Sequence, residues 1–174
     1  MTTTVAAALA VVSVLCLFNL FLLTAVIRRL RAHEAQHAPV DLPLPAAGRT
    51  VGPFATTEPD AVSDRDLVEP AVVLFVMPNC SPCHELIGSA AAAGLDPGRT
   101  FVFVAGDPAD PATGEVVSAV RPLGRVSVVA PEGPVAAAFG GITGFPTLLR
   151  VEAGRVVAAG RDLGALRPAL HSAR

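Results

Sequence analysis

The 174-residue sequence contains only three cysteines, too few for the disulfide framework of a small secreted domain. A zinc site is not indicated either, because no second Cys/His pair with ligand spacing accompanies Cys80 and Cys83. Basic residues are also sparse: thirteen of them, against fifteen acidic residues, leave a net charge of −2 and form no basic stripe. This charge pattern argues against nucleic acid as a partner.

Charge is entirely missing from the stretch Val5–Ile27, in a chain that is 52% hydrophobic with a mean hydropathy of +0.56. With a rise of ~1.5 Å per residue, such a helix would cross a hydrocarbon core of roughly 30 Å. No basic residue precedes the stretch, and Arg28, Arg29 and Arg31 follow it, which is unlike a cleaved signal peptide. We therefore expect an uncleaved anchor in the lipid bilayer, with Cys16 as an apolar filler within it.

The segment after the anchor is first polar and then rich in proline and alanine. Such a composition is typical of a semi-extended linker. We accordingly divide the chain into an N-terminal transmembrane anchor over 1–30, a Pro/Ala-rich linker over 31–49, and one folded domain over 50–174.

A short motif inside this domain carries the chemistry. The apolar run Val72–Val76 is typical of a buried strand, and it leads within a few residues to Cys80 and Cys83, which open a helical pattern. Unpaired backbone N–H groups and the positive dipole end at a helix N-terminus favour a thiolate over a thiol. The second sulfur, one turn later, can attack a mixed disulfide formed on the first. The motif therefore predicts dithiol–disulfide exchange.

Other interpretations of the same motif remain open. Residues Cys80–His84 also match the attachment pattern of c-type haem. Such a cytochrome needs a distal ligand, but Met1 lies at the start of the anchor and Met77 lies too close to the motif. His33, His37 and His171 are possible ligands, although nothing else in the sequence points to them. A redox-inert module could instead hold Cu(I) through the two thiolates, or the pair could be structural. The redox hypothesis explains the preceding strand best, and it requires no cofactor and no resident metal.

The rest of the domain alternates apolar runs with helical patterns. We expect a short edge strand over 51–57, a helical turn over 63–68 capped by Ser63, and the cysteine helix over 81–93, ending at Gly94. Leu86, Ile87 and Ala90–Ala91 of that helix should pack on the sheet. The other expected elements are strands over 101–105 and 126–130, helices over 111–120 and 133–139, a hairpin over 147–151 and 155–159, and a final helix over 163–171. This order predicts an α/β fold with a mixed central sheet and helices on both faces.

A second motif, Gly144–Phe145–Pro146–Thr147, directly precedes the hairpin, whose turn contains Gly154. With both motifs in this order, the chain resembles the thioredoxin-like superfamily from about Thr50 to Arg174. The anchor and the Val-Gly-x-Phe opening of the domain make it similar to the membrane-anchored TlpA-like thiol-disulfide oxidoreductases, among them the type that matures methylamine dehydrogenase.

The resemblance implies a thioredoxin-like fold in which Pro146 is a cis-proline that faces the cysteines. It also implies that the backbone of Phe145, Pro146 and Thr147 binds the substrate by strand addition. The dipeptide Ser81–Pro82 between the cysteines would tune the redox potential.

The sequence departs from this family at two positions. Many relatives carry a tryptophan before the first cysteine, where this chain has Asn79, and a buried acid on the preceding strand, where it has Leu74. The usual proton acceptor for the second cysteine is then missing, and His84 and Glu85 are the nearest substitutes in sequence. We therefore expect a slower or partner-directed reaction.

From these observations, Cys80 is expected to attack the disulfide of a partner protein and Cys83 to resolve the mixed disulfide. A membrane or extracytoplasmic redox protein would supply or remove the electrons. Two rules give opposite predictions for the side of the membrane on which the folded domain lies. Arg28, Arg29 and Arg31 favour a cytoplasmic domain by the positive-inside rule, whereas disulfide chemistry favours the other side. We expect a single-pass membrane protein with an extracytoplasmic catalytic domain.

Overall fold

The computed structural model describes residues 13, 15–22, 24 and 43–166, in a chain that divides into the units Met1–Asp41 and Leu42–Arg174. In the first unit the described residues are helical and expose apolar side chains such as Leu17 and Phe21. No helix formed by described residues has both the length and the apolar character needed to cross a membrane. Most of the predicted anchor, and the linker up to residue 42, lie outside the described residues.

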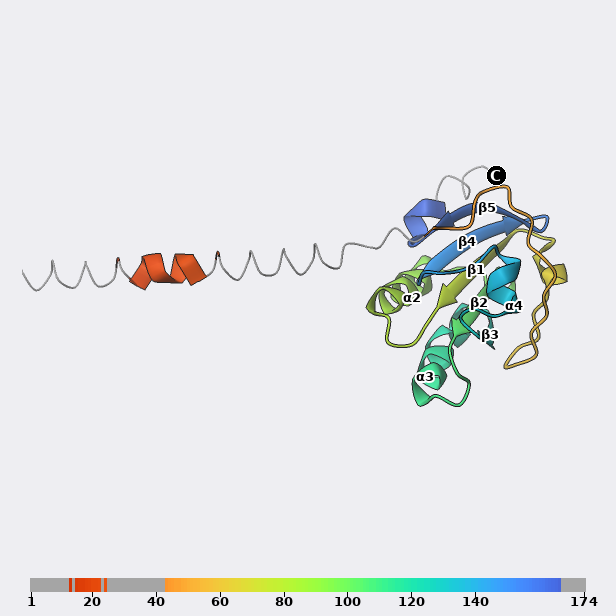
Figure 1. Cartoon of the computed structure of the whole chain (residues 1–174), viewed down its shortest axis with the longest axis horizontal. Helices are drawn as coiled ribbons and strands as arrows, with labels where there is room; N and C mark the ends of the chain where they lie inside the picture. Colours follow the sequence, from red (N-terminus) through yellow and green to blue (C-terminus); the bar gives the residue numbers. More distant parts are fainter. Residues whose placement is uncertain (1–12, 14, 23, 25–42, 167–174) are drawn as a thin grey trace, which may run out of the picture. The chain divides into compact units, whose positions relative to one another are not determined.

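The second unit is built on a five-stranded mixed sheet with the order β3-β2-β1-β4-β5 (Figure 1). Strands β1, β2 and β3 are parallel, whereas β4 is antiparallel to both β1 and β5. The mixed sheet predicted from the sequence is therefore confirmed. The strands are β1 (Ala71–Val76), β2 (Thr100–Ala105), β3 (Arg125–Val129), β4 (Thr147–Glu152) and β5 (Arg155–Gly160).

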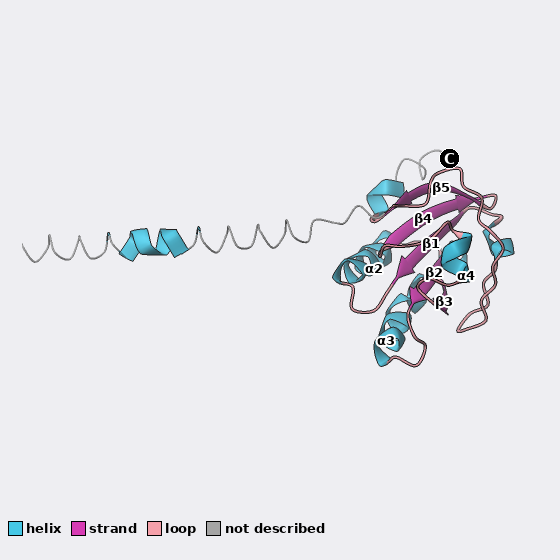
Figure 2. Cartoon of the chain, viewed as in Figure 1, coloured by secondary structure: helices cyan, strands magenta, loops and turns pink. Residues whose placement is uncertain are grey.

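Helices lie on both faces of this sheet (Figure 2). They are α2 (Ser81–Ala93), α3 (Pro111–Val120) and α4 (Pro134–Ala138), with the short 3-10 helices η1 (Asp64–Leu67), η2 (Pro97–Arg99), η3 (Arg121–Leu123) and η4 (Leu163–Leu166). Helix α2 ends at Gly94, whose φ of 64° lies in the left-handed region that glycine adopts without penalty. Helix α3 begins after Asp110, whose carboxylate accepts the N–H of Ala112 at 2.9 Å.

The two faces of the sheet have different cores. Four phenylalanines pack together on the α4 side, with neighbouring ring centroids 5.0 to 6.0 Å apart: Phe54, Phe75, Phe103 and Phe139. On the other side, α2 and α3 pack aliphatic side chains against the sheet. Leu86, Ile87 and Ala90 are buried there as predicted, but Ala91 is exposed.

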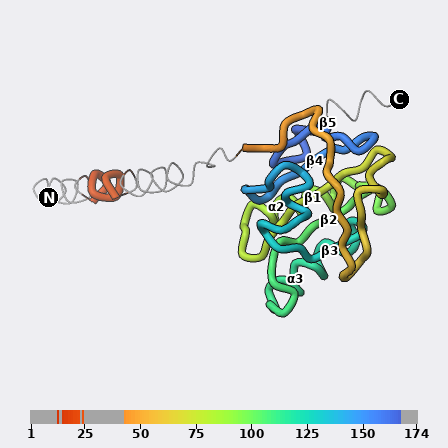
Figure 3. Tube along the Cα trace, turned by 45° about the vertical axis from the view of Figure 1, so that its right-hand side comes forward, coloured from red at the N-terminus to blue at the C-terminus, as the bar shows by residue number. Residues whose placement is uncertain are grey.

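The segment 48–63, hereafter the strap, corrects the prediction of an edge strand over 51–57. Instead of one continuous strand it forms isolated bridges, at Thr50 with Arg155 and at Ala55 with Ser63. At one end the N–H of Gly48 donates to the carbonyl of Val156 on β5. Beyond it, the strap crosses the domain to β3, as Figure 3 shows in orange and yellow. It covers both edges of the sheet, which would otherwise offer unpaired backbone groups.

Two smaller differences concern the C-terminal part. The hairpin turn contains two residues with positive φ, Ala153 at 49° and Gly154 at 69°, where only the glycine was expected. The final helix is a short 3-10 turn over Leu163–Leu166, and the rest of the predicted helix lies outside the described residues.

Candidate functional site

The cysteine pair lies where β1 passes into α2. After the strand the chain turns at Asn79, whose φ of 57° falls in the left-handed region that asparagine tolerates better than most residues. Cys80 is the N-cap of α2, and its Sγ accepts a hydrogen bond from the backbone N–H of Cys83 at 3.2 Å. The first sulfur is thus held against an N–H group of the opening helical turn, where negative charge is favoured.

The two cysteines are joined in a disulfide, with their Sγ atoms 2.05 Å and their Cα atoms 5.2 Å apart. Their exposure differs strongly. Cys80 is half-buried, whereas only 1% of the Cys83 surface is exposed. An incoming group can therefore reach the first sulfur far more easily than the second.

The surroundings of Cys83 are apolar. It belongs to the cluster on the α2 side of the sheet, together with the fully buried Leu74 and with Leu86. Within residues 43–166, no aspartate or glutamate is buried. His84 and Glu85, the two nearest titratable residues in sequence, are exposed on α2. A Cys83 thiol would therefore have no buried carboxylate beside it to take its proton.

The second motif, Gly144–Thr147, lies at the end of the sheet where β1 leads to Cys80. Thr147 on β4 pairs with Phe75 on β1, so the preceding residues lie beside the end of β1 that leads to Cys80. The Phe145–Pro146 peptide bond is cis, as the resemblance implied. Phe145 and Cys80 both pack, partly buried, against the apolar cluster that contains Cys83.

Two polar contacts shape the segment around Pro146. The hydroxyl of Thr147 donates to the carbonyl of Gly144 at 2.7 Å and closes the turn. Arg161, just after β5, donates from Nη1 to the carbonyl of Pro146 at 3.4 Å. Arg161 was not predicted from the sequence, because no motif surrounds it and the contact joins residues fifteen positions apart.

The motif dipeptide, Ser81 and Pro82, is exposed in the first turn of α2. Proline suits this position because it has no N–H to leave unpaired. The described residues contain no group of three or more His, Cys, Asp or Glu side chains that could hold a metal ion. Cys16, in the first unit, is a free and exposed thiol.

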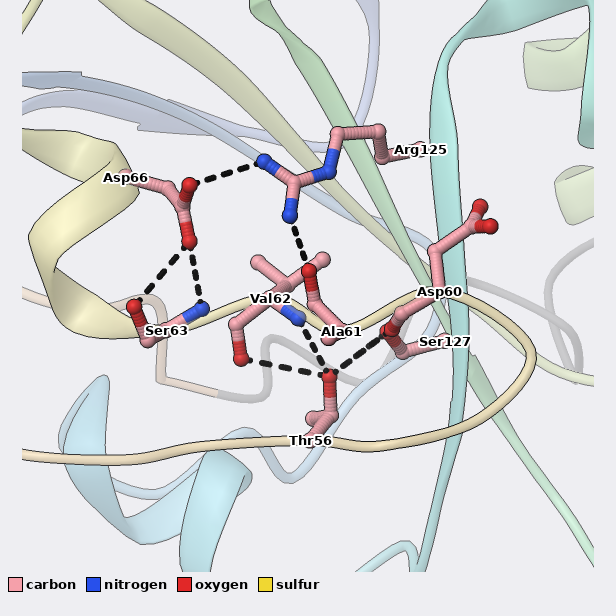
Figure 4. A network of polar contacts seen from close by, with 8 residues as sticks. All are labelled: Thr56, Asp60, Ala61, Val62, Ser63, Asp66, Arg125 and Ser127. Atoms are coloured by element: carbon pink, nitrogen blue, oxygen red, sulfur yellow. Dashed lines mark hydrogen bonds and ion pairs between the residues drawn. The ribbon is translucent and has the colours of Figure 1, made fainter.

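A polar network lies where the strap and η1 meet β3 (Figure 4). The Asp66 carboxylate accepts hydrogen bonds from Arg125 at 2.8 Å and from the backbone N–H and hydroxyl of Ser63 at 2.8 and 3.0 Å. Burial alone would raise the pKa of Asp66, but the bonds from Arg125 and Ser63 outweigh it and hold the pKa below the usual 3.8. The predicted cap at Ser63 is thus completed by Asp66.

Asp60 is the other carboxylate of this network. It accepts the backbone N–H of Val126 at 2.7 Å and Arg121 Nη1 at 2.8 Å. The backbone hydrogen bond lowers the pKa of Asp60 most, burial raises it, and Arg121 lowers it further, so it lies below 3.8. Nearby, the hydroxyls of Thr56 and Ser127 are 2.8 Å apart. These contacts fasten the strap to β3.

Solved structures share this architecture. The thioredoxin domain of a thiol-disulfide oxidoreductase from Bacteroides vulgatus aligns with a TM-score of 0.57 and 17% identity, over 73% of this chain and 96% of that one. A DsbF homologue from Corynebacterium diphtheriae aligns with a TM-score of 0.54 and 17% identity, over 78% of this chain and 94% of that one. A thio-disulfide isomerase from Thermus thermophilus aligns with a TM-score of 0.53 and 23% identity, over 73% of this chain and 96% of that one.

No protein-family model and no curated protein matches the sequence. At these identities the structural neighbours establish the fold, and the chain has the thioredoxin-like fold that its two motifs predicted.

Proposed function

We propose that this chain, with its thioredoxin-like fold, is a thiol–disulfide oxidoreductase that works through Cys80 and Cys83. The supporting observation is the asymmetry of the pair. Cys80 is accessible and its Sγ is held by a helix N-terminal N–H, whereas Cys83 is buried one turn away within disulfide distance. Attack from the first sulfur and resolution by the second follow from this arrangement.

In the reducing direction, the Cys80 thiolate attacks one sulfur of a substrate disulfide. The substrate S–S bond breaks, a new bond joins Cys80 to the substrate, and the departing thiolate takes up a proton. The Cys83 thiolate then attacks Cys80 Sγ and releases the second substrate thiol. The substrate gains two electrons and two protons, and the chain is left with the Cys80–Cys83 disulfide. The oxidising direction reverses these steps.

The second step requires Cys83 to lose its proton in an apolar cluster that disfavours a negative charge. Since no carboxylate among residues 43–166 is buried, the acceptor that we propose for this proton is water or the leaving thiolate. The mixed disulfide should consequently be long-lived. That suits a reaction with a bound partner better than rapid turnover of many substrates.

The partner proposed here is a protein that bears a disulfide and pairs with the backbone of Phe145, Pro146 and Thr147. This segment leads into β4 beside the end of β1 that precedes Cys80, and this position supports that role. We also propose that Val5–Ile27 anchors the chain in a membrane, with the domain on the extracytoplasmic side and a second redox protein that resets the pair. The uncharged sequence and the helical conformation of residues 15–22 support the anchor.

The activity is tested with the reduced full chain and a fluorogenic peptide disulfide. We expect wild type to cleave the peptide, Cys80→Ala to be inactive, and Cys83→Ala to stop at a one-to-one mixed disulfide. Cys16→Ala is the matched control and should behave like wild type, because Cys16 lies in the other unit of the chain. Undiminished cleavage by Cys80→Ala would contradict the proposal, as would stoichiometric Cu(I) binding without any cleavage.

The location is tested with a membrane-impermeant thiol reagent on intact cells, before and after mild reduction, in a Cys16→Ala background. Labelling of Cys80 only after reduction would support an extracytoplasmic domain with a resting disulfide. Labelling that appears only after the cells are lysed would contradict that location.

A further inference from the structure

Arg150 is the one charged residue among residues 43–166 that is buried, with 6% of its surface exposed. It lies in the middle of β4, paired with Val72 on β1 and with Ala158 on β5. Leu149 and Val151 belong to the phenylalanine core, so the alternation of strand side chains places Arg150 on the α2 side of the sheet. A cation in this position requires a partner for each of its donors.

The structure supplies only part of that requirement. Arg150 Nε and Nη2 both approach the same oxygen of Glu152, at 2.7 and 2.5 Å. Nη1 is buried and has no hydrogen-bond partner. A guanidinium carries five N–H donors, and Glu152 uses two of them. The edge formed by Nη1 and the second N–H of Nη2 is therefore unpaired, and its geometry matches a carboxylate in a two-point contact.

Arg150 also lines a cavity of about 330 Å³ between the C-terminal end of α2 and the first residues of β1 and β2. Most of the other lining residues are apolar, among them Val72, Ala93 and Leu95. Asp96 and Arg99 line it as well, and the Asp96 carboxylate is occupied by the N–H of Gly98 at 2.9 Å. The Arg99 side chain is 48% exposed, and its Nη2 pairs with the Glu69 carboxylate at 2.7 Å.

We infer that this cavity binds a small carboxylate with an apolar body. The carboxylate pairs with the open edge of Arg150, and the hydrocarbon lies against the apolar wall. A free phosphate fits less well, because the apolar lining offers little to replace its water. The cavity lies at the first residues of β1, whereas Cys80 follows the last residue of that strand, so this site is separate from the cysteine pair.

The test is isothermal titration calorimetry of the oxidised full chain with octanoate, 1-octanol and inorganic phosphate. We expect saturable binding of octanoate only. Arg150→Met should weaken it by about tenfold or more, because the charge-assisted contact is lost. Arg121→Met removes an arginine that pairs with Asp60 instead, and it should bind octanoate like wild type.

Ala93→Phe provides an independent arm, because Ala93 is exposed at the end of α2 and a larger side chain there fills the cavity. It should weaken octanoate binding even if Arg150→Met fails to fold. The inference is overturned if octanoate gives no saturable heat with wild type, or if octanol or phosphate binds as tightly. It is equally overturned if folded Arg150→Met or folded Ala93→Phe keeps the wild-type affinity, which would leave Arg150 a purely structural counter-charge.

Discussion

Two regions of the domain differ in how many hydrogen bonds their reactive or charged side chains make. Where the strap meets β3, each carboxylate of the network has at least two hydrogen-bond partners, as Asp60 and Asp66 show. At the end of β1, Cys83 is surrounded by aliphatic side chains, and Leu74 stands where an acid could serve it. Paired charges fasten the strap to β3, whereas no carboxylate among residues 43–166 is buried, and so none lies buried beside Cys83.

This contrast has a physical basis. A carboxylate that is fully paired contributes stability but has no donor or acceptor left for a substrate. A sulfur in an apolar cluster adds little by hydrogen bonding, yet its redox state can change without disturbing charged neighbours. The difference between the two ends therefore predicts where substitutions change reactivity and where they change only stability.

The largest effect is expected from an acid placed beside Cys83. Leu74→Glu and Leu74→Gln should each lower the free energy of unfolding by about 3 kcal/mol, because both bury a polar group in the aliphatic cluster. Only the glutamate can accept a proton, so it alone should speed resolution of the mixed disulfide, by about tenfold or more. Stopped-flow decay of the mixed disulfide measures this. Equal rates in the two variants would show that proton removal from Cys83 is not limiting.

The polar end should respond in stability alone. Asp60→Ala leaves the N–H of Val126 without its acceptor and should cost about 1–3 kcal/mol in urea unfolding. Glu69→Ala is the matched control. It breaks an ion pair to Arg99 of similar length, but Glu69 is 74% exposed, so the loss should stay below about 1 kcal/mol. Similar losses in both variants would contradict a structural role for the Asp60 contacts.

The turn before Cys80 offers a smaller test at the reactive end. Asn79 is exposed and has a positive φ, so Asn79→Val should lose about 1–2 kcal/mol of stability from backbone strain alone. Asn79→Gly should stay close to wild type, because glycine adopts this conformation freely. Thermal unfolding of the oxidised chain measures both. A stable valine variant would mean that the turn can relax to another conformation.

The smallest expected effect is a loss of stability at low pH. The folded-state pKa values of Asp60 and Asp66 lie below 3.8, so each carboxylate stabilises the fold fully above its unfolded pKa. That contribution is lost as the pH falls from about 4 through the lowered folded values. Urea unfolding between pH 6 and pH 2.5 should show this loss in wild type and a shallower one in Asp60→Asn/Asp66→Asn. Identical slopes would contradict the hydrogen-bonding account.

Local patterns were enough to predict the elements around the site. The start of α2 follows from the helical pattern that the two cysteines open, and its end follows from Gly94; both are confirmed. The hairpin follows from two apolar runs with a glycine between them, although the left-handed φ of Ala153 was missed.

Features that depend on contacts between residues distant in sequence were not predicted. The strap was expected to be a strand, because nothing local to 51–57 shows that its hydrogen bonds go to β3, α4 and the hairpin. The contact of Arg161 with Pro146 and the burial of Arg150 are decided by pairing along the sheet. Sequence spacing alone does not contain this information.

The proposed order of attack and resolution requires unequal reactivity of the two sulfurs, which can be measured directly. The fully reduced chain is treated with a limiting amount of iodoacetamide, and the alkylated cysteine is identified by mass spectrometry at short times. We predict that Cys80 is modified much faster than Cys83, because it is more accessible and its Sγ accepts a hydrogen bond from an N–H in the first turn of α2, where a thiolate is favoured. Modification of Cys83 as fast as Cys80 would contradict the proposed order of attack and resolution.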